Sequence, residues 1–114
     1  MNRARINHLI DVVLPKVEPG DFNMSTWRHH CGTVFCAMGH AANDPVFRAE
    51  GLGWTEDEDT YVPDFDGSHG IGAAALFFDI DYATARDWFL PSSYEDFGNR
   101  PTPAQVADRI RAWL

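Results

Sequence analysis

Two consecutive helices are predicted by residues 71–89, which read IGAAALFFDIDYATARDWF. The first, which ends at Phe78, is apolar on almost every side and is expected in the interior of the protein. Asp81 is a suitable N-cap for the second helix. That second helix places its core-forming side chains on one face: Ala85, Trp88 and Phe89. We therefore expect both helices to contribute to one core.

Two further helices are predicted upstream of this pair. Residues 3–14 carry apolar side chains at helical spacing, and Pro15 ends the pattern. Residues 33–42 are nearly all small or apolar and carry no formal charge, so they predict a helix that is buried on most sides. This interpretation places Cys36 in the middle of that helix.

The C-terminal segment carries a complete signal for the start of a helix. Thr102 is the predicted cap, Pro103 occupies the first helical position, and Gln105 completes a capping box. The helix that follows has one apolar stripe, which consists of Val106, Ile110, Trp113 and Leu114. We expect Val106, Ile110 and Trp113 to make it an integral part of the core.

Together these patterns predict a mainly α fold, with α+β as the alternative. Residues 1–114 are the length of one ordinary domain and contain no internal repeat or linker. The expected architecture is a compact domain of four to five short helices with at most a small two- or three-stranded sheet.

The charge of the chain bears on the kind of partner that it can bind. Its 17 acidic and 9 basic residues give a formal net charge of −8. This charge repels nucleic acid phosphates and anionic lipid, and it favours a protein partner with a basic surface. The sequence predicts no direct binding to nucleic acid and no membrane association, and it leaves the oligomeric state open. Without an apolar span or a secretory signal, we expect a cytoplasmic location.

Two cysteines and three histidines fall within residues 29–40. In one interpretation they bind zinc, with Cys36 and His40 on one helix face and Cys31 or His30 approaching from the preceding loop. In a second, Cys31 is a nucleophile at a helix N-terminus and His69 is its base. In a third, Cys31 and Cys36 form a transient disulfide.

A structural interpretation of the same residues is the one we favour. The spacing matches no common zinc module, and no complete catalytic set is present. Free cysteine is among the most buried residue types, and Gly32 and Gly39 allow backbones to approach closely. We therefore expect no cofactor, no metal and no catalytic residue, and we expect Cys36 to act mainly on stability.

An acidic segment covers residues 56–66 and has the composition of a surface loop, with a short extended piece at 61–63. Either it is a solvated loop, or it docks on a basic partner through Glu56, Asp57, Glu58, Asp59, Asp64 and Asp66. Interface hot spots favour aromatic residues, so the docking surface would include Trp54, Tyr61 and Phe65. The same aromatic residues are equally suited to anchor the segment in the core.

Several segments of the chain resemble a set of uncharacterised small proteins of bacteria and their phages. They are the opening amphipathic helix, residues 22–27, the block Cys31-Gly-Thr-x-x-Cys36-x-x-Gly39, residues 73–80 with 85–89, and residues 102–110. Similar sequences have Trp after this block where the present chain has His40. The resemblance implies a genomic setting and no residue-level activity. Phage proteins of this size and acidity are often inhibitors of host proteins, and some present carboxylates in place of nucleic acid phosphates.

We therefore expect a small, acidic, non-enzymatic binding protein. More specifically, the resemblance implies a phage-encoded inhibitor of a host defence or nucleic-acid-processing protein. Such an inhibitor would act in the host cytoplasm. The alternative is a small cysteine- or zinc-dependent enzyme centred on Cys31, Cys36, His40 and His69.

Overall fold

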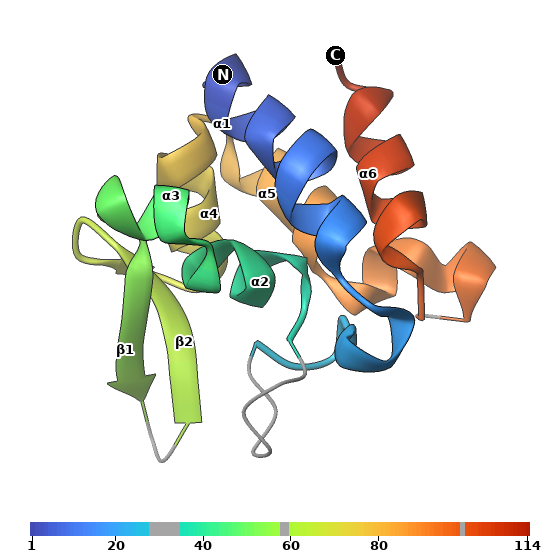
Figure 1. Cartoon of the computed structure of the whole chain (residues 1–114), viewed down its shortest axis with the longest axis horizontal. Coiled ribbons are helices and arrows are strands. Elements are labelled where there is room, and N and C mark those ends of the chain that lie inside the picture. Colours follow the sequence, from blue (N-terminus) through green and yellow to red (C-terminus); the bar gives the residue numbers. More distant parts are fainter. Residues whose placement is uncertain (28–34, 58–59, 99) are drawn as a thin grey trace.

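The computed structural model describes residues 1–27, 35–57, 60–98 and 100–114, and the side chain of Asp57 is also outside the description. Its α-helices are α1 (Arg3–His8), α2 (Ala37–Asn43), α3 (Pro45–Ala49), α4 (Ile71–Phe78), α5 (Tyr82–Phe89) and α6 (Pro103–Arg111). Its strands are β1 (Gly53–Asp57), β2 (Thr60–Phe65) and β3 (Ser68–His69). The mainly helical fold class with a small three-stranded sheet is confirmed (Figure 1).

The N-terminal helical run lies between α4 on one side and α6 on the other (Figure 1). It continues from α1 through a π-helical turn at Leu9–Val13 and a 3-10 turn at Leu14–Lys16. The π turn does not end the helical run, and the predicted apolar stripe is buried along its whole length. All five of its residues are buried: Ile6, Leu9, Ile10, Val13 and Leu14.

Helices α4 and α5 form the centre of the core, as their sequence predicts. The Asp81 carboxylate accepts a 2.7 Å hydrogen bond from the Thr84 backbone N–H, which confirms Asp81 as the N-cap. Phe47 of α3 meets Phe77 and Phe78 of α4 edge to face, an arrangement that aromatic quadrupoles favour, and Phe78 stacks on Phe89 of α5. The buried rings are Phe47, Phe77, Phe78, Trp88 and Phe89.

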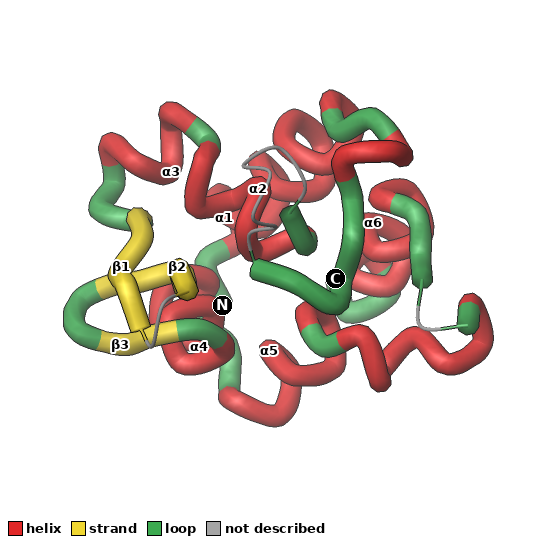
Figure 2. The backbone as a smooth tube through the Cα atoms, turned by 90° about the horizontal axis from the view of Figure 1, so that it is seen from below, coloured by secondary structure: helices red, strands yellow, loops and turns green. Residues whose placement is uncertain are grey.

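The three strands form an antiparallel sheet in the order β1, β2, β3. Figure 2 shows them grouped at one side of the molecule, with α6 at the other side. The β2–β3 turn consists of Asp66 and Gly67, which have φ values of 50° and 82°. Two successive left-handed residues are what a type I′ hairpin turn requires, and Asp-Gly supplies them readily.

The prediction of a surface loop at residues 56–66 is therefore wrong in part. Apart from Glu58 and Asp59, which lie outside the described residues, the segment is occupied by paired strands as far as Phe65. The extended piece predicted at 61–63 is confirmed as the centre of β2. Among the described residues, none of the helices has the length and apolar character that a bilayer crossing requires.

The predicted start is confirmed for α6 but not for α2. At α6 the full capping box of Thr102 and Gln105 is confirmed. At α2 the helix begins at Ala37, so Cys36 is its N-cap and not a mid-helix residue. A Cβ atom at Gly39 would overlap the Trp27 carbonyl oxygen, which confirms that this glycine allows a close backbone approach.

The expectation that Trp113 is a core residue is wrong. Val106 and Ile110 are fully buried, whereas Trp113 is 49% exposed. Because α6 ends at Arg111, the helical stripe does not continue to Trp113. The Trp113 ring still packs edge to face against the buried Trp88, with 6.4 Å between ring centroids.

Candidate functional site: the acidic hairpin

The hairpin of β1 and β2 is held to the helical body at its base. Trp54 donates a 3.1 Å hydrogen bond from Nε1 to Asn43 Oδ1 at the end of α2, and its ring lies 5.9 Å from the ring of Phe35. Phe65 packs edge to face on Phe77 of α4, with 5.0 Å between centroids. These two aromatic residues of the predicted docking surface are thus anchors, packed against the core.

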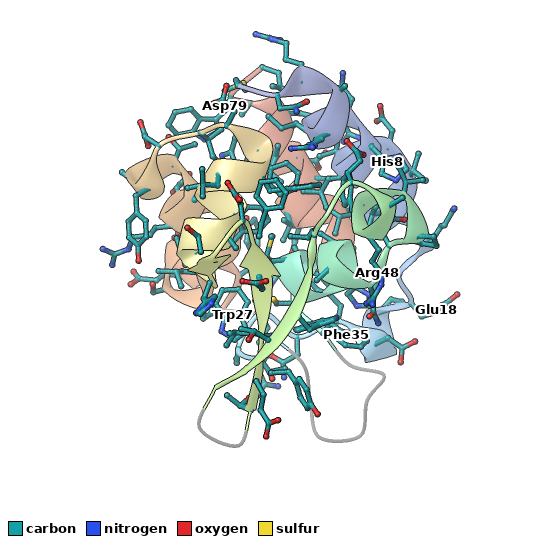
Figure 3. The ribbon with its side chains drawn as sticks, turned by 90° about the vertical axis from the view of Figure 1, so that its left-hand side faces the viewer. His8, Glu18, Trp27, Phe35, Arg48 and Asp79 are labelled. Carbon is teal, nitrogen blue, oxygen red and sulfur yellow. The ribbon has the colours of Figure 1, made fainter. Side chains whose placement is uncertain are left out.

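The opposite end of the hairpin extends beyond the helices (Figures 1 and 3). There Glu56 pairs across the strands with Tyr61, and both residues are exposed. Directly paired residues point to the same face of a sheet, so a carboxylate and a phenol ring are presented side by side. The backbone of Asp57 pairs with Thr60 next to them. The sequence then adds Glu58 and Asp59 between the strands, outside the described residues.

The two remaining acidic candidates lie at the other end of β2. Asp64 Oδ1 is 3.4 Å from His69 Nε2 of β3, and Asp66 occupies the β2–β3 turn. Asp64 lies three residues from Tyr61, the partner of Glu56, which places it about 10 Å away and on the opposite face of the strand, and Asp66 lies farther away in the turn. The predicted acidic face is therefore divided between the tip of the hairpin and its base.

Cys36 is engaged by the backbone of its own helix. Its sulfur accepts a hydrogen bond from the Gly39 N–H at 3.3 Å, and the residue is 1% exposed. Burial disfavours the thiolate and raises the pKa of the Cys36 thiol to about 12. A thiol that stays protonated at neutral pH and has no access to solvent is a poor nucleophile and a poor metal ligand.

His40 of α2 contacts the preceding segment at Asp21 and Phe22. Its Nε2 donates a 2.8 Å hydrogen bond to the carbonyl oxygen of Asp21, and its ring is stacked against Phe22. Burial lowers the pKa of His40, opposed by the hydrogen bond to Asp21 and by the charge of that residue. This contact needs a proton on Nε2, so that nitrogen is not available to a metal.

The other members of the cysteine and histidine set are His30, Cys31 and His69. His30 and Cys31 lie outside the described residues, and His69 is an exposed residue of β3. Within the described ranges, no three His, Cys, Asp or Glu side chains are grouped so that they could hold a metal ion. The described arrangement of Cys36 and His40 is that of two structural residues.

No family model, curated protein or solved structure matches the chain.

Sequence reasoning missed the pairing of Glu56 with Tyr61 and the anchoring role of Asn43. The signal for the first was the pair of five- and six-residue segments on either side of Glu58 and Asp59, which suits a hairpin with a two-residue connection. Asn43 carried no signal, because a hydrogen bond between residues 11 positions apart depends on how α2 and β1 pack.

Proposed function

We propose that the chain is a non-enzymatic binding protein that docks on a basic surface of a partner protein through the tip of the β1–β2 hairpin. The observation that carries this proposal is a hairpin with an anchored base that presents the exposed Glu56 beside Tyr61 at its far end. Trp54 and Phe65 fix the base, so these two residues are presented in a defined position. Preorganised contact groups bind with a smaller loss of conformational entropy.

The net charge of −8 supports the same proposal at longer range. Unlike charges attract before contact and raise the rate of association, which suits a partner with a basic groove. Proteins that process nucleic acid have such grooves. With the resemblance to small phage proteins, this makes a host protein of that class the partner that we propose, with binding in the host cytoplasm.

The test is affinity capture from a bacterial lysate with the wild-type protein and with a hairpin variant in which four acids are neutralised: Glu56→Gln, Asp57→Asn, Glu58→Gln and Asp59→Asn. We expect the captured protein to bind the hairpin variant at least tenfold more weakly, while the variant melts at or above the wild-type temperature because repulsion is relieved. The measured association rate of the wild type should fall as salt rises, and that of the hairpin variant should change little.

A control variant removes the same charge from exposed positions elsewhere: Glu18→Gln, Glu95→Gln, Asp96→Asn and Asp108→Asn. It should retain most of the affinity. If both variants weaken binding equally, net charge alone is responsible and the hairpin is not the docking site. If neither variant affects binding, the proposal is wrong.

A further inference from the structure

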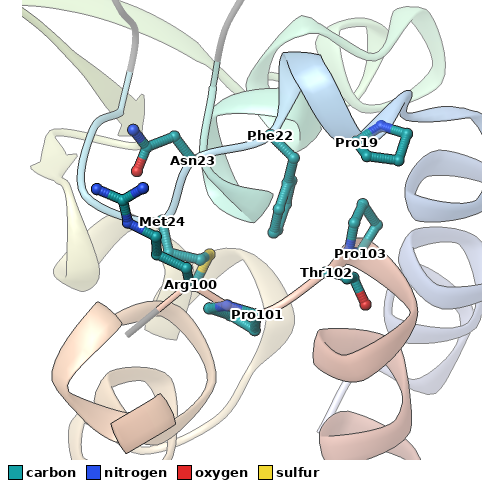
Figure 4. A pocket seen from close by; sticks show the side chains of 8 residues that line it. All are labelled: Pro19, Phe22, Asn23, Met24, Arg100, Pro101, Thr102 and Pro103. Atoms are coloured by element: carbon teal, nitrogen blue, oxygen red, sulfur yellow. The ribbon is translucent and has the colours of Figure 1, made fainter. Parts of the chain in front are cut away.

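A groove runs along the side of the molecule between the N-terminal helical run and α6. Its first part, of about 260 Å³, lies between the segment from Pro19 to Met24 and the segment from Arg100 to Pro103 (Figure 4). Its second part, of about 300 Å³, lies between the N-terminal helical run and α6. The two parts share three lining residues, so they adjoin one another: Pro19, Thr102 and Pro103.

The second part of the groove is mostly apolar, whereas the first part has polar and apolar surface in about equal measure. Phe22 points its ring into the first part (Figure 4), and Ile10, Leu14 and Ala107 contribute to the second. Four prolines also line it, and proline has no N–H to offer to a neighbouring strand: Pro15, Pro19, Pro101 and Pro103. A ligand would be held through its apolar side chains and not by strand pairing.

The charge of the groove is opposite to that of the molecule as a whole. Among the described residues that line it, the charged side chains are Arg100 and Arg111, and none is acidic. Arg111 is already paired with Asp108 at 3.0 Å and with Asp11 at 3.5 Å. The exposed Arg100 has no ion pair or side-chain hydrogen bond within the described part of the chain.

The length of the groove indicates the size of the ligand that it can hold. From Pro103 to Arg111 the helix rises about 12 Å, and the segment from Arg100 to Pro103 extends the groove to roughly 20 Å. An extended peptide covers this distance with about six residues. Asn23 lines the same end of the groove as Arg100 and supplies an amide, a second group that can bind a carboxylate.

We infer that this groove binds an extended peptide segment of a partner protein, with apolar side chains along its length and an acidic residue at the Arg100 end. The groove is separate from the hairpin. It binds an acidic segment, whereas the hairpin binds a basic surface. A bidentate pair between a guanidinium and a carboxylate would give the segment its direction.

The test is selection from a displayed library of random heptapeptides, with depletion on an Ala104→Trp variant before selection on the wild type. Ala104 is exposed and lines the groove, so a tryptophan there fills the groove while the hairpin is left intact. Circular dichroism and a thermal melt check that the variant is folded. We expect enriched peptides with two or more apolar residues and one aspartate or glutamate.

The selected peptide is then compared with its Asn or Gln counterpart by calorimetry. We expect the acidic form to bind about fivefold more tightly, as a partly exposed ion pair allows. Arg100→Gln should remove this difference, and Arg3→Gln, at an exposed position in α1 outside the groove, should retain it. Amide chemical shift changes should map to Phe22, Met24 and Thr102.

Three results would overturn the inference. They are failure to enrich any peptide beyond the Ala104→Trp control, enrichment of peptides without an acidic residue, and an acid preference that persists in Arg100→Gln. Sedimentation that shows dimers of the wild type and monomers of Ala104→Trp would assign the groove to a second copy of the chain and would also overturn it. None of these results depends on the hairpin, so the two proposals fail separately.

Discussion

At the scale of single residues, Cys36 occupies a position that usually belongs to Ser, Thr, Asp or Asn. It is the N-cap of α2, and its sulfur accepts the hydrogen bond from Gly39 N–H that a cap oxygen would otherwise accept. Sulfur is a weak acceptor, but the site is fully enclosed by core residues. A small apolar side chain with some capacity to accept a hydrogen bond suits such a site.

This geometry predicts an order of stability for two substitutions. Cys36→Ser keeps a cap acceptor and should cost less than about 1 kcal/mol, because its hydroxyl has Gly39 N–H as a partner. Cys36→Ala leaves that buried N–H without a partner and should cost about 1–2 kcal/mol. Urea denaturation of both variants measures the difference.

The same experiment distinguishes capping from simple burial of the side chain. If burial of an apolar group were all that mattered, alanine would be tolerated better than serine, and the order would be reversed. A variant with the native melting temperature and no partner binding would instead show that Cys36 has a functional role.

The sequence did not reveal the cap because the residues around it are uniformly small and apolar. Asp81 and Thr102 are correctly predicted as caps, since each is a good cap residue placed directly before a helical pattern. The start of α2 has no such change of character. Its position is determined by contacts from distant segments, such as the Cys36 N–H bond to the Thr26 carbonyl at 2.8 Å.

At the scale of elements, α6 shows how far a sequence pattern extends. The capping box defines its start, and Val106 and Ile110 enter the core as predicted. A stripe that reaches Trp113 requires helical geometry as far as that residue, but the helix ends at Arg111. The end of a helix with no Gly or Pro signal is difficult to place from sequence.

Two substitutions on this element should therefore differ in cost. Ile110→Ala creates a cavity at a fully buried site and should destabilise the protein by about 2–5 kcal/mol. Trp113→Ala removes a half-exposed ring whose described contact is with Trp88, and it should cost less than half as much as Ile110→Ala. Thermal melts of the two variants provide the comparison. A larger loss from Trp113→Ala would show that the ring is part of the core.

The hairpin was harder to predict than α6 for a different physical reason. Acidic residues and proline have low strand propensity, and β2 contains Pro63 as well as Asp64. What stabilises the strands is their cross-strand pairing and the packing of Trp54 and Phe65 on the helical body. Such tertiary contacts override local preference, and they are not visible in a single sequence.

At the scale of the whole molecule, the stability of the fold depends on pH through two buried groups, the thiol of Cys36 and the phenol of Tyr94. Burial raises the pKa of Cys36 from 9.0 to about 12. Burial also raises the pKa of Tyr94 above its usual 10.0, and the Tyr94 hydroxyl donates a 2.7 Å hydrogen bond to the Trp88 carbonyl. In both cases the folded chain holds a proton that the unfolded chain releases at lower pH, so both contributions to stability are complete below pH 9 and are lost as pH rises.

We expect the free energy of unfolding, measured by urea denaturation, to be nearly constant from pH 7 to 8.5 and to fall between pH 9 and 12. A shift of one pKa unit corresponds to about 1.4 kcal/mol, so Cys36 alone would account for a loss of up to roughly 4 kcal/mol over that interval. Cys36→Ser keeps the carboxylates that repel one another and lacks the titrating thiol. Its stability should therefore fall less steeply than that of the wild type. If both proteins lose stability in parallel, the buried thiol is not the cause, and the loss comes from Tyr94 and from repulsion across a chain of charge −8.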